Sequence, residues 1–120
     1  MSSSAPSSLT QKKCIPCEGG VPPLADDVQA RLLAELDEVG RGWRIESGHH
    51  LERDYEFPDF VTALAFTNAV GALAEEEAHH PDLLLRWGRV SLSIWTHKID
   101  GLTESDFVLA AKIDRLREQE

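Results

Sequence analysis

Three of the five histidines in this chain lie close together, at positions 79, 80 and 97. An imidazole has an unperturbed pKa of about 6.5, so it can donate or accept a proton near neutral pH. Glu75, one helical turn before His79, and Asp106, nine residues after His97, are carboxylates that could orient the rings. The cluster of His79, His80 and His97 therefore predicts acid/base catalysis or metal binding.

A zinc site is the alternative interpretation, since three imidazoles and a carboxylate are all possible zinc ligands. Adjacent histidines rarely direct both rings at one metal ion, so we expect no metal at His79 and His80. His49 and His50 are also adjacent, but they follow a predicted turn, where we expect surface or capping positions. We interpret the acidic run Glu75, Glu76 and Glu77 as a solvated helix face, on which only Glu75 is positioned to contribute to the candidate site.

The two cysteines, Cys14 and Cys17, form one CxxC motif in a segment rich in Pro and Gly. One such motif supplies only two of the four ligands of a structural zinc site. It does not lie between a strand and a helix, as a thioredoxin-type site would. We assign it no function from the sequence.

Seven elements must position these side chains. Apolar residues recur at helical spacing in three segments and alternate with polar residues in four others. We expect helices at 26–38, 60–77 and 103–116, and strands at 43–46, 51–57, 83–87 and 90–97. Strands joined by short turns pair antiparallel. The sequence therefore predicts an α+β fold, a four-stranded antiparallel sheet with helices on one face, in the order α-β-β-α-β-β-α.

The candidate residues fall at the ends of three of these elements. His79 and His80 end the second helix, where the helix dipole favours a protonated imidazole and Pro81 prevents continuation. His97 ends the fourth predicted strand, and Asp106 lies in the first turn of the last helix, in a capping-box-like segment. We expect a concave site where these ends meet.

Composition excludes some classes of protein. Acidic residues outnumber basic ones by 21 to 12, for a net charge of −9, and no basic patch is present, so we expect no nucleic acid partner. No apolar run approaches the roughly 20 residues of a membrane span, and the Ser-rich start has no apolar signal region. We therefore expect no membrane association and a cytoplasmic location. Residues 1–22 are predicted to be a disordered or loosely attached tail, and 23–120 a single domain.

At the candidate positions the sequence resembles the pterin-4a-carbinolamine dehydratases. That family carries an acidic or polar residue before His-His-Pro, then an aromatic residue, a Thr-His and a Gly-Leu-(Ser/Thr)-Glu-x-Asp segment. The matching residues here are Glu75, His79, His80, Pro81, Trp87, Thr96, His97 and residues 101–106. The resemblance runs from about residue 22 to 116. One departure is Leu83, where animal members tend to carry Trp.

The resemblance implies that the protein dehydrates 4a-hydroxytetrahydropterin to quinonoid dihydropterin and so recycles tetrahydropterin for an aromatic amino acid hydroxylase. This reaction needs a proton delivered to the leaving hydroxyl and one removed from N5, with no metal or redox cofactor. His80 and His97 are expected nearest these atoms, with His79 sharing the acid/base work. Which imidazole is the acid stays open.

The resemblance also implies a set of substrate-binding residues and an oligomer. The expected pterin contacts are His79, His80, Pro81, Trp87, Thr96, His97, Lys98 and Ile99, with Glu75 and Asp106 orienting the rings. Family members form dimers or tetramers, so we expect a homodimer or homotetramer. The alternative is a non-catalytic binding or assembly protein on the same fold. Retention of all three histidines favours the enzyme.

Overall fold

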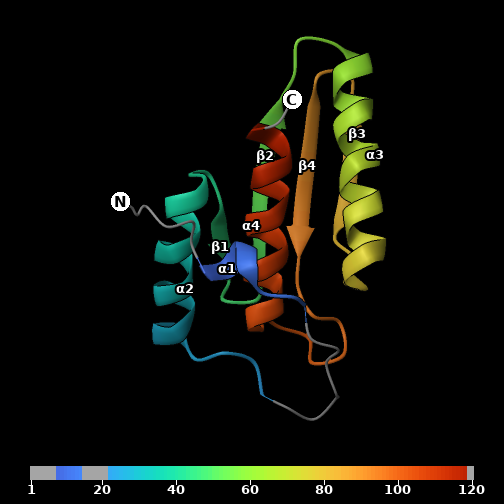
Figure 1. The fold of residues 1–120 in the computed structure, drawn as a ribbon. Coiled ribbons are helices and arrows are strands. Elements are labelled where there is room, and N and C mark those ends of the chain that lie inside the picture. The colour runs from blue at the N-terminus through green and yellow to red at the C-terminus, as the bar shows by residue number, and fades with distance from the viewer. Residues whose placement is uncertain (1–7, 15–21, 119–120) are drawn as a thin grey trace.

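The alternating segments form a four-stranded sheet in the computed structural model, which describes residues 8–14 and 22–118 (Figure 1). The strands are β1 (Arg44–Glu46), β2 (His50–Glu56), β3 (Asp82–Arg86) and β4 (Arg89–Ile94). Their order across the sheet is β1-β2-β4-β3, and every neighbouring pair is antiparallel. The predicted α+β class and antiparallel sheet are confirmed.

The strand register determines which side chains face the helices. Leu51 of β2 pairs with Ile94 of β4, and Tyr55 pairs with Val90. All four side chains are buried, whereas the two serines of β4 lie between them on the opposite face and are partly exposed. Period-two alternation thus gives the sheet one apolar face and one polar face.

The three long helices are α2 (Asp26–Val39), α3 (Phe60–Glu77) and α4 (Glu104–Glu118), and a single turn, α1 (Ser8–Gln11), precedes them. Tyr55 contacts Phe66 of α3 and hydrogen-bonds Asp114 of α4, so both helices cover the apolar face of the sheet. α2 and α1 pack against α4 (Figure 1). Within the described residues, none of the helices combines the length and apolar character needed to span a membrane.

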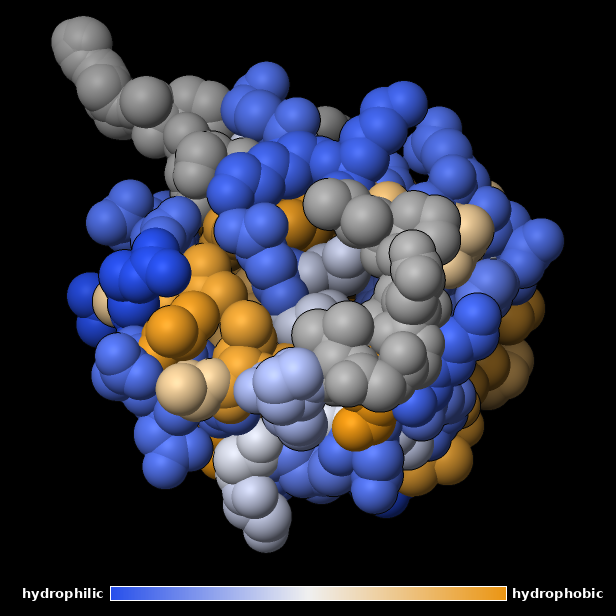
Figure 2. Space-filling model, turned by 90° about the horizontal axis from the view of Figure 1, so that it is seen from below, coloured by the Kyte–Doolittle hydropathy of each residue, from blue (hydrophilic) through white to orange (hydrophobic). Residues whose placement is uncertain are grey.

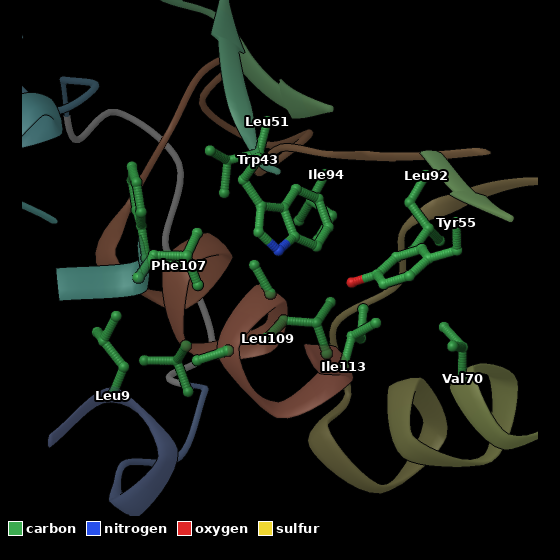
Figure 3. Packing of buried hydrophobic residues seen from close by; sticks show 14 of the residues in the cluster. Leu9, Trp43, Leu51, Tyr55, Val70, Leu92, Ile94, Phe107, Leu109 and Ile113 are labelled. Atoms are coloured by element: carbon green, nitrogen blue, oxygen red, sulfur yellow. The ribbon is translucent and has the colours of Figure 1, made fainter. Parts of the chain in front are cut away.

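The core lies between the sheet and α4. Figure 3 shows Trp43, Leu51 and Ile94 on the sheet side, opposite Leu109 and Ile113 of α4, and all of them are buried. Burying one large apolar side chain contributes about 1.5–3 kcal/mol, so this layer supplies much of the stability that holds the helix ends in place.

A buried polar cluster sits within this core. The carboxylate of Asp114 accepts hydrogen bonds from the indole of Trp43 at 2.9 Å, from Arg53 at 2.9 Å and from the hydroxyl of Tyr55. Burial raises the pKa of Asp114 to about 6, although the three donors oppose this shift. Among the described residues, Arg53 Nε is a buried side-chain atom without a hydrogen-bond partner. The cluster orients Trp43 and Tyr55 against α4, but ionising the buried Asp114 carboxyl costs free energy.

The fourth strand ends earlier than the sequence predicts. β4 stops at Ile94, whereas alternation predicts a strand that continues to His97. Ile94 pairs with Leu51, the second residue of β2, so only His50 of that strand lies beyond this pair. It turns instead, and the Thr96 N–H donates to the Gly101 carbonyl at 2.9 Å. His97 therefore lies in a turn beside the sheet.

Residues 8–14, which we name the N-terminal strap, belong to the segment 1–22 that the sequence predicts to be a disordered or loosely attached tail, and they contact the domain. Leu9 is fully buried in the core, and Lys12 Nζ contacts Glu104 Oε2 of α4 at 2.7 Å. A lone apolar residue in a polar segment has no periodicity, which is why the sequence did not reveal this contact. Cys14 belongs to the strap, while Cys17 lies outside the described residues.

Candidate active site

Three element ends meet at one end of the molecule, at the bottom of Figure 1: the C-terminal ends of α3 and β4 and the N-terminal end of α4. These ends carry the candidate histidines and Asp106. Figure 2, which views the molecule from this end, shows a mostly hydrophilic surface with apolar patches left of centre and along the right edge. The convergence predicted from the sequence is thus present.

Helix α3 ends in a turn that separates the two adjacent histidines. Ala78 takes the left-handed conformation, with φ 54° and ψ 38°. Its N–H remains bonded to the last turn of α3, and the His79 N–H donates to the Ala74 carbonyl at 3.1 Å. This hydrogen bond spans the left-handed residue, as in a helix C-cap of the Schellman type. The chain leaves the helix abruptly, so His79 and His80 reach different partners.

His79 is held by Asp106. The distance from His79 Nε2 to Asp106 Oδ1 is 2.6 Å, and the Asp106 side chain is completely buried. Asp106 Oδ2 accepts the hydroxyl of Thr96 at 2.9 Å and the N–H of Thr103 at 2.8 Å. A carboxylate accepts hydrogen bonds, so Nε2 is the ring nitrogen of His79 that donates in this pair. The Thr103 contact is also the reciprocal half of the capping box expected from the sequence.

His80 pairs with Glu75 instead. His80 Nε2 lies 2.5 Å from Glu75 Oε2, but the His80 side chain is 58 % exposed and that of Glu75 is 79 % exposed. The sequence spacing placed Glu75 beside His79, and the left-handed turn at Ala78 explains why the partner is His80. A pair this exposed contributes less than about 1 kcal/mol to stability, so it orients His80 loosely.

A pocket of about 300 Å³ lies between these groups. It is lined by Ala78, His79, His80, Trp95, Thr96, His97 and Lys98. The Trp95 and His97 rings contact each other, with centroids 4.5 Å apart. The structure thus brings together the three histidines singled out by the sequence: His79 is held by a buried carboxylate, His80 is loosely paired with an exposed one, and His97 contacts an aromatic ring.

Three predicted substrate contacts do not line this pocket. Pro81 and Ile99 are each adjacent in sequence to a lining residue and are partly exposed. Trp87 follows β3 at the turn to β4, the end of this hairpin remote from His80, and is 69 % exposed. A pterin in this pocket would therefore not touch Trp87 of the same chain.

Trp95 forms a wall of the pocket that was not among the expected site residues. The centroid of the Trp95 ring lies 5.4 Å from that of the His49 ring and 5.8 Å from that of the His50 ring, so these two histidines support it. His49 Nε2 also contacts Asp100 Oδ1 at 2.7 Å, in the turn that carries His97. The alternation that puts Trp95 on the same side as His97 was the available signal.

The candidate residues, all within the described part of the chain, do not form a metal site. Among residues 8–14 and 22–118, no three or more His, Cys, Asp or Glu side chains are grouped so that they could hold a metal ion. Two of the three candidate imidazoles instead contact carboxylates through Nε2. The zinc interpretation therefore has no ligand set in the described residues.

The fold and pocket define a small α+β protein with a histidine-lined pocket at the helix and strand ends. The chain belongs to the pterin 4 alpha carbinolamine dehydratase family, whose model matches residues 22–116.

Two relatives named "Putative pterin-4-alpha-carbinolamine dehydratase" illustrate the similarity. The protein of Alkaliphilus metalliredigens is 53% identical over 107 residues, covering 89% of this chain and 94% of that protein. The protein of Rickettsia bellii is 56% identical over 110 residues, covering 92% and 95% of the two chains. The match thus extends over nearly the whole of each relative.

Solved structures agree with this assignment. A transcriptional coactivator/pterin dehydratase from Brucella melitensis superposes with a TM-score of 0.71 at 30% identity, over 78% of this chain and 97% of that chain. A pterin dehydratase-like protein described as a RuBisCO assembly factor in the alpha-carboxysome superposes with a TM-score of 0.56 at 24% identity, over 65% and 92%. The second likeness establishes only a shared fold.

Proposed function

We propose that this protein dehydrates 4a-hydroxytetrahydropterin to quinonoid dihydropterin by histidine acid/base catalysis, in support of an aromatic amino acid hydroxylase. The observation that carries the proposal is the His79–Asp106 pair at the edge of a pocket also lined by His80 and His97. Membership of the dehydratase family supports the choice of substrate.

The reaction breaks the bond between C4a and its hydroxyl oxygen. The leaving oxygen takes a proton to depart as water, the N5–H proton is removed, and the electron pair from N5 forms the C4a=N5 double bond. An acid and a base on either side of this bond are sufficient, and such groups typically accelerate a reaction by about 10² to 10⁴. In this proposal, His80 and His97 lie nearest the hydroxyl and N5.

His79 is best suited to a proton-accepting or substrate-orienting role. Its Nε2–H is held by Asp106, so Nδ1 of the neutral ring presents a lone pair. The buried carboxylate would also stabilise the imidazolium that forms when Nδ1 takes a proton, as an orienting carboxylate does in a catalytic triad. Thr96, which lines the pocket, donates its hydroxyl to Asp106 and so holds that carboxylate in turn.

The proposal includes self-association. Phe60, Val61 and Leu64 of α3 expose apolar side chains, as do Leu84 and Trp87 near the edge strand β3. An uncovered sheet edge and exposed apolar side chains favour contact with a second copy. Sedimentation at micromolar concentration should give a mass at least twice that of one 13.3 kDa chain. A single-chain mass would contradict it.

Stopped-flow absorbance on freshly generated carbinolamine tests the activity. The wild-type protein should accelerate dehydration without added metal, and EDTA should not change the rate. Each of the changes His79→Ala, His80→Ala and His97→Ala should lower the rate by about 10- to 10³-fold. Arg86→Ala, at the far end of the hairpin, is the control and should have the wild-type rate.

Three outcomes contradict the proposal. No acceleration by the wild-type protein would favour a non-catalytic binding or assembly role on the same fold. Loss of activity in EDTA, restored by zinc, would contradict the metal-free mechanism. Equal losses in Arg86→Ala and the histidine variants would place the chemistry elsewhere.

A further inference from the structure

The N-terminal strap, residues 8–14, precedes the segment that matches the family model yet lies beside the candidate active site. Leu9 anchors its first turn in the core, and Lys12 contacts Glu104 in the first turn of α4. This ion pair is 43 % and 46 % exposed, so it adds little by itself. Burial of Leu9 is what holds the strap on α4.

The strap, α3 and α4 are joined at one side chain, Glu77. Glu77 Oε1 accepts the backbone N–H of Cys14 at 3.0 Å, and Oε2 accepts from Lys112 Nζ of α4 at 2.6 Å. The side chains of Glu77 and Lys112 are only 9 % and 17 % exposed. Both carboxylate oxygens of Glu77 are therefore engaged, and little of either side chain is exposed.

Glu77 is charged in this setting. Burial opposes ionisation, but the Cys14 N–H and the Lys112 ammonium outweigh it and hold the pKa of Glu77 below its ordinary value. The interactions with Cys14 and Lys112 are hydrogen bonds to an ionised acceptor, which are stronger and more directional than neutral ones.

This junction is adjacent to both members of the His79–Asp106 pair. Glu77 is the last residue of α3, and His79 follows two residues later, after the turn at Ala78. On the other side, the thiol of Cys14 lies 3.5 Å from the carbonyl of Ser105, the residue before Asp106. The strap thus touches the two backbone segments that carry the pair.

We propose that Glu77 is a positioning residue that, through the strap and Lys112, fixes the end of α3 against α4 and so sets His79 against Asp106. The sequence predicts a solvated helix face for Glu75, Glu76 and Glu77, with only Glu75 positioned to matter. In the structure the Glu75 side chain is largely exposed, whereas the Glu77 side chain is mostly covered. The expected effect of Glu77 on kcat rests on the proposed dehydratase function, whereas its effect on the placement of His79 against Asp106 does not.

The test compares Glu77→Gln with Glu76→Gln in the full-length chain. The two changes remove the same charge from neighbouring residues, and Glu76 is exposed. Two quantities are measured well below the unfolding temperature: kcat and KM for dehydration, and the NMR signal of the His79 Nε2–H proton. A displacement near 1 Å can cost about 10²-fold in rate, so partial loosening should lower kcat about tenfold.

In Glu77→Gln we expect that lower kcat, with KM changed less than threefold, and loss of the Nε2–H signal through exchange with water. Glu76→Gln should match the wild-type protein in both measurements. Suppose instead that Glu77→Gln matches Glu76→Gln in both kcat and the Nε2–H signal and differs only in a lower melting temperature. Glu77 would then be merely structural, and the proposal would be wrong.

A second pair of variants covers a failure of Glu77→Gln to fold. Lys112→Met should reproduce the loss of signal, while Lys112→Arg, which keeps the cation, should retain it. Equal behaviour of these two variants would overturn the proposal. If the wild-type protein has no dehydratase activity, the proposed function fails, and the NMR signal alone still decides whether Glu77 positions His79.

Discussion

Replacing Asp106 with Asn should test most directly how the site controls His79. Asp106 is completely buried and uses one oxygen for His79 and the other for Thr96 and Thr103. Asn has nearly the same shape, so the variant should fold. It has only one acceptor oxygen, however, and its amide nitrogen is a donor.

The orientation of the new amide follows from the fixed donors around it. The Thr103 N–H can only donate, so the amide oxygen must replace the oxygen 2.8 Å from it, and the amide NH₂ must face His79. Nε2 of His79 then becomes an acceptor, and the proton of the neutral ring moves to Nδ1. The ring would present a donor to the pocket where the wild-type ring presents a lone pair.

The magnitude follows from the lost interaction. A hydrogen bond to a charged group contributes about 1.5–3 kcal/mol, and each 1.36 kcal/mol corresponds to tenfold in rate. Asp106→Asn should therefore lower kcat by about 10- to 150-fold, with KM changed far less.

Stopped-flow kinetics would measure kcat, and circular dichroism would confirm that the variant is folded. Asp82→Asn, an exposed aspartate at the start of β3, is the matched control and should have the wild-type rate. A folded Asp106→Asn variant with kcat within twofold of wild type would refute the argument, because the His79 tautomer would then not matter.

Other predictions concern stability. Burial raises the pKa of Asp114 from 3.8 to about 6, so the protonated carboxyl stabilises the fold. This contribution to the unfolding free energy is complete below pH 3.8 and is lost as the pH rises through about 6, a total loss of about 3 kcal/mol. Urea unfolding at pH 4 and pH 7 should show a smaller loss for Asp114→Asn than for wild type, and an equal loss would contradict the assignment. Leu9→Ala should lower the unfolding free energy by about 2–4 kcal/mol in the same assay, and a change below about 0.5 kcal/mol would mean that the strap is not docked. Ala78→Gly should raise the melting temperature slightly, because glycine adopts φ 54° without the cost that alanine bears, and a fall would show that unfolded-chain entropy dominates.

Much of the fold could be predicted because it is encoded locally. The helix at Phe60–Glu77 has the predicted bounds, since helical spacing, Pro58 before it and Pro81 after it all act within a few residues. Alternation along residues 90–97 places Thr96 on the same side as Ile94, and both are buried. The end of β4 was not predictable from its own residues, because it depends on where β2 begins.

The amino-acid sequence alone determined the class of fold and which histidines and carboxylates compose the candidate site, because periodicity and motif spacing are properties of neighbouring residues. Only the tertiary structure decided the partners: Asp106 for His79, Glu75 for His80, and Glu77 for the strap. One left-handed residue, Ala78, redirects both imidazoles, and residues far apart in sequence supply their surroundings. Such pairings depend on the relative placement of whole elements, which the packing of the shared core sets.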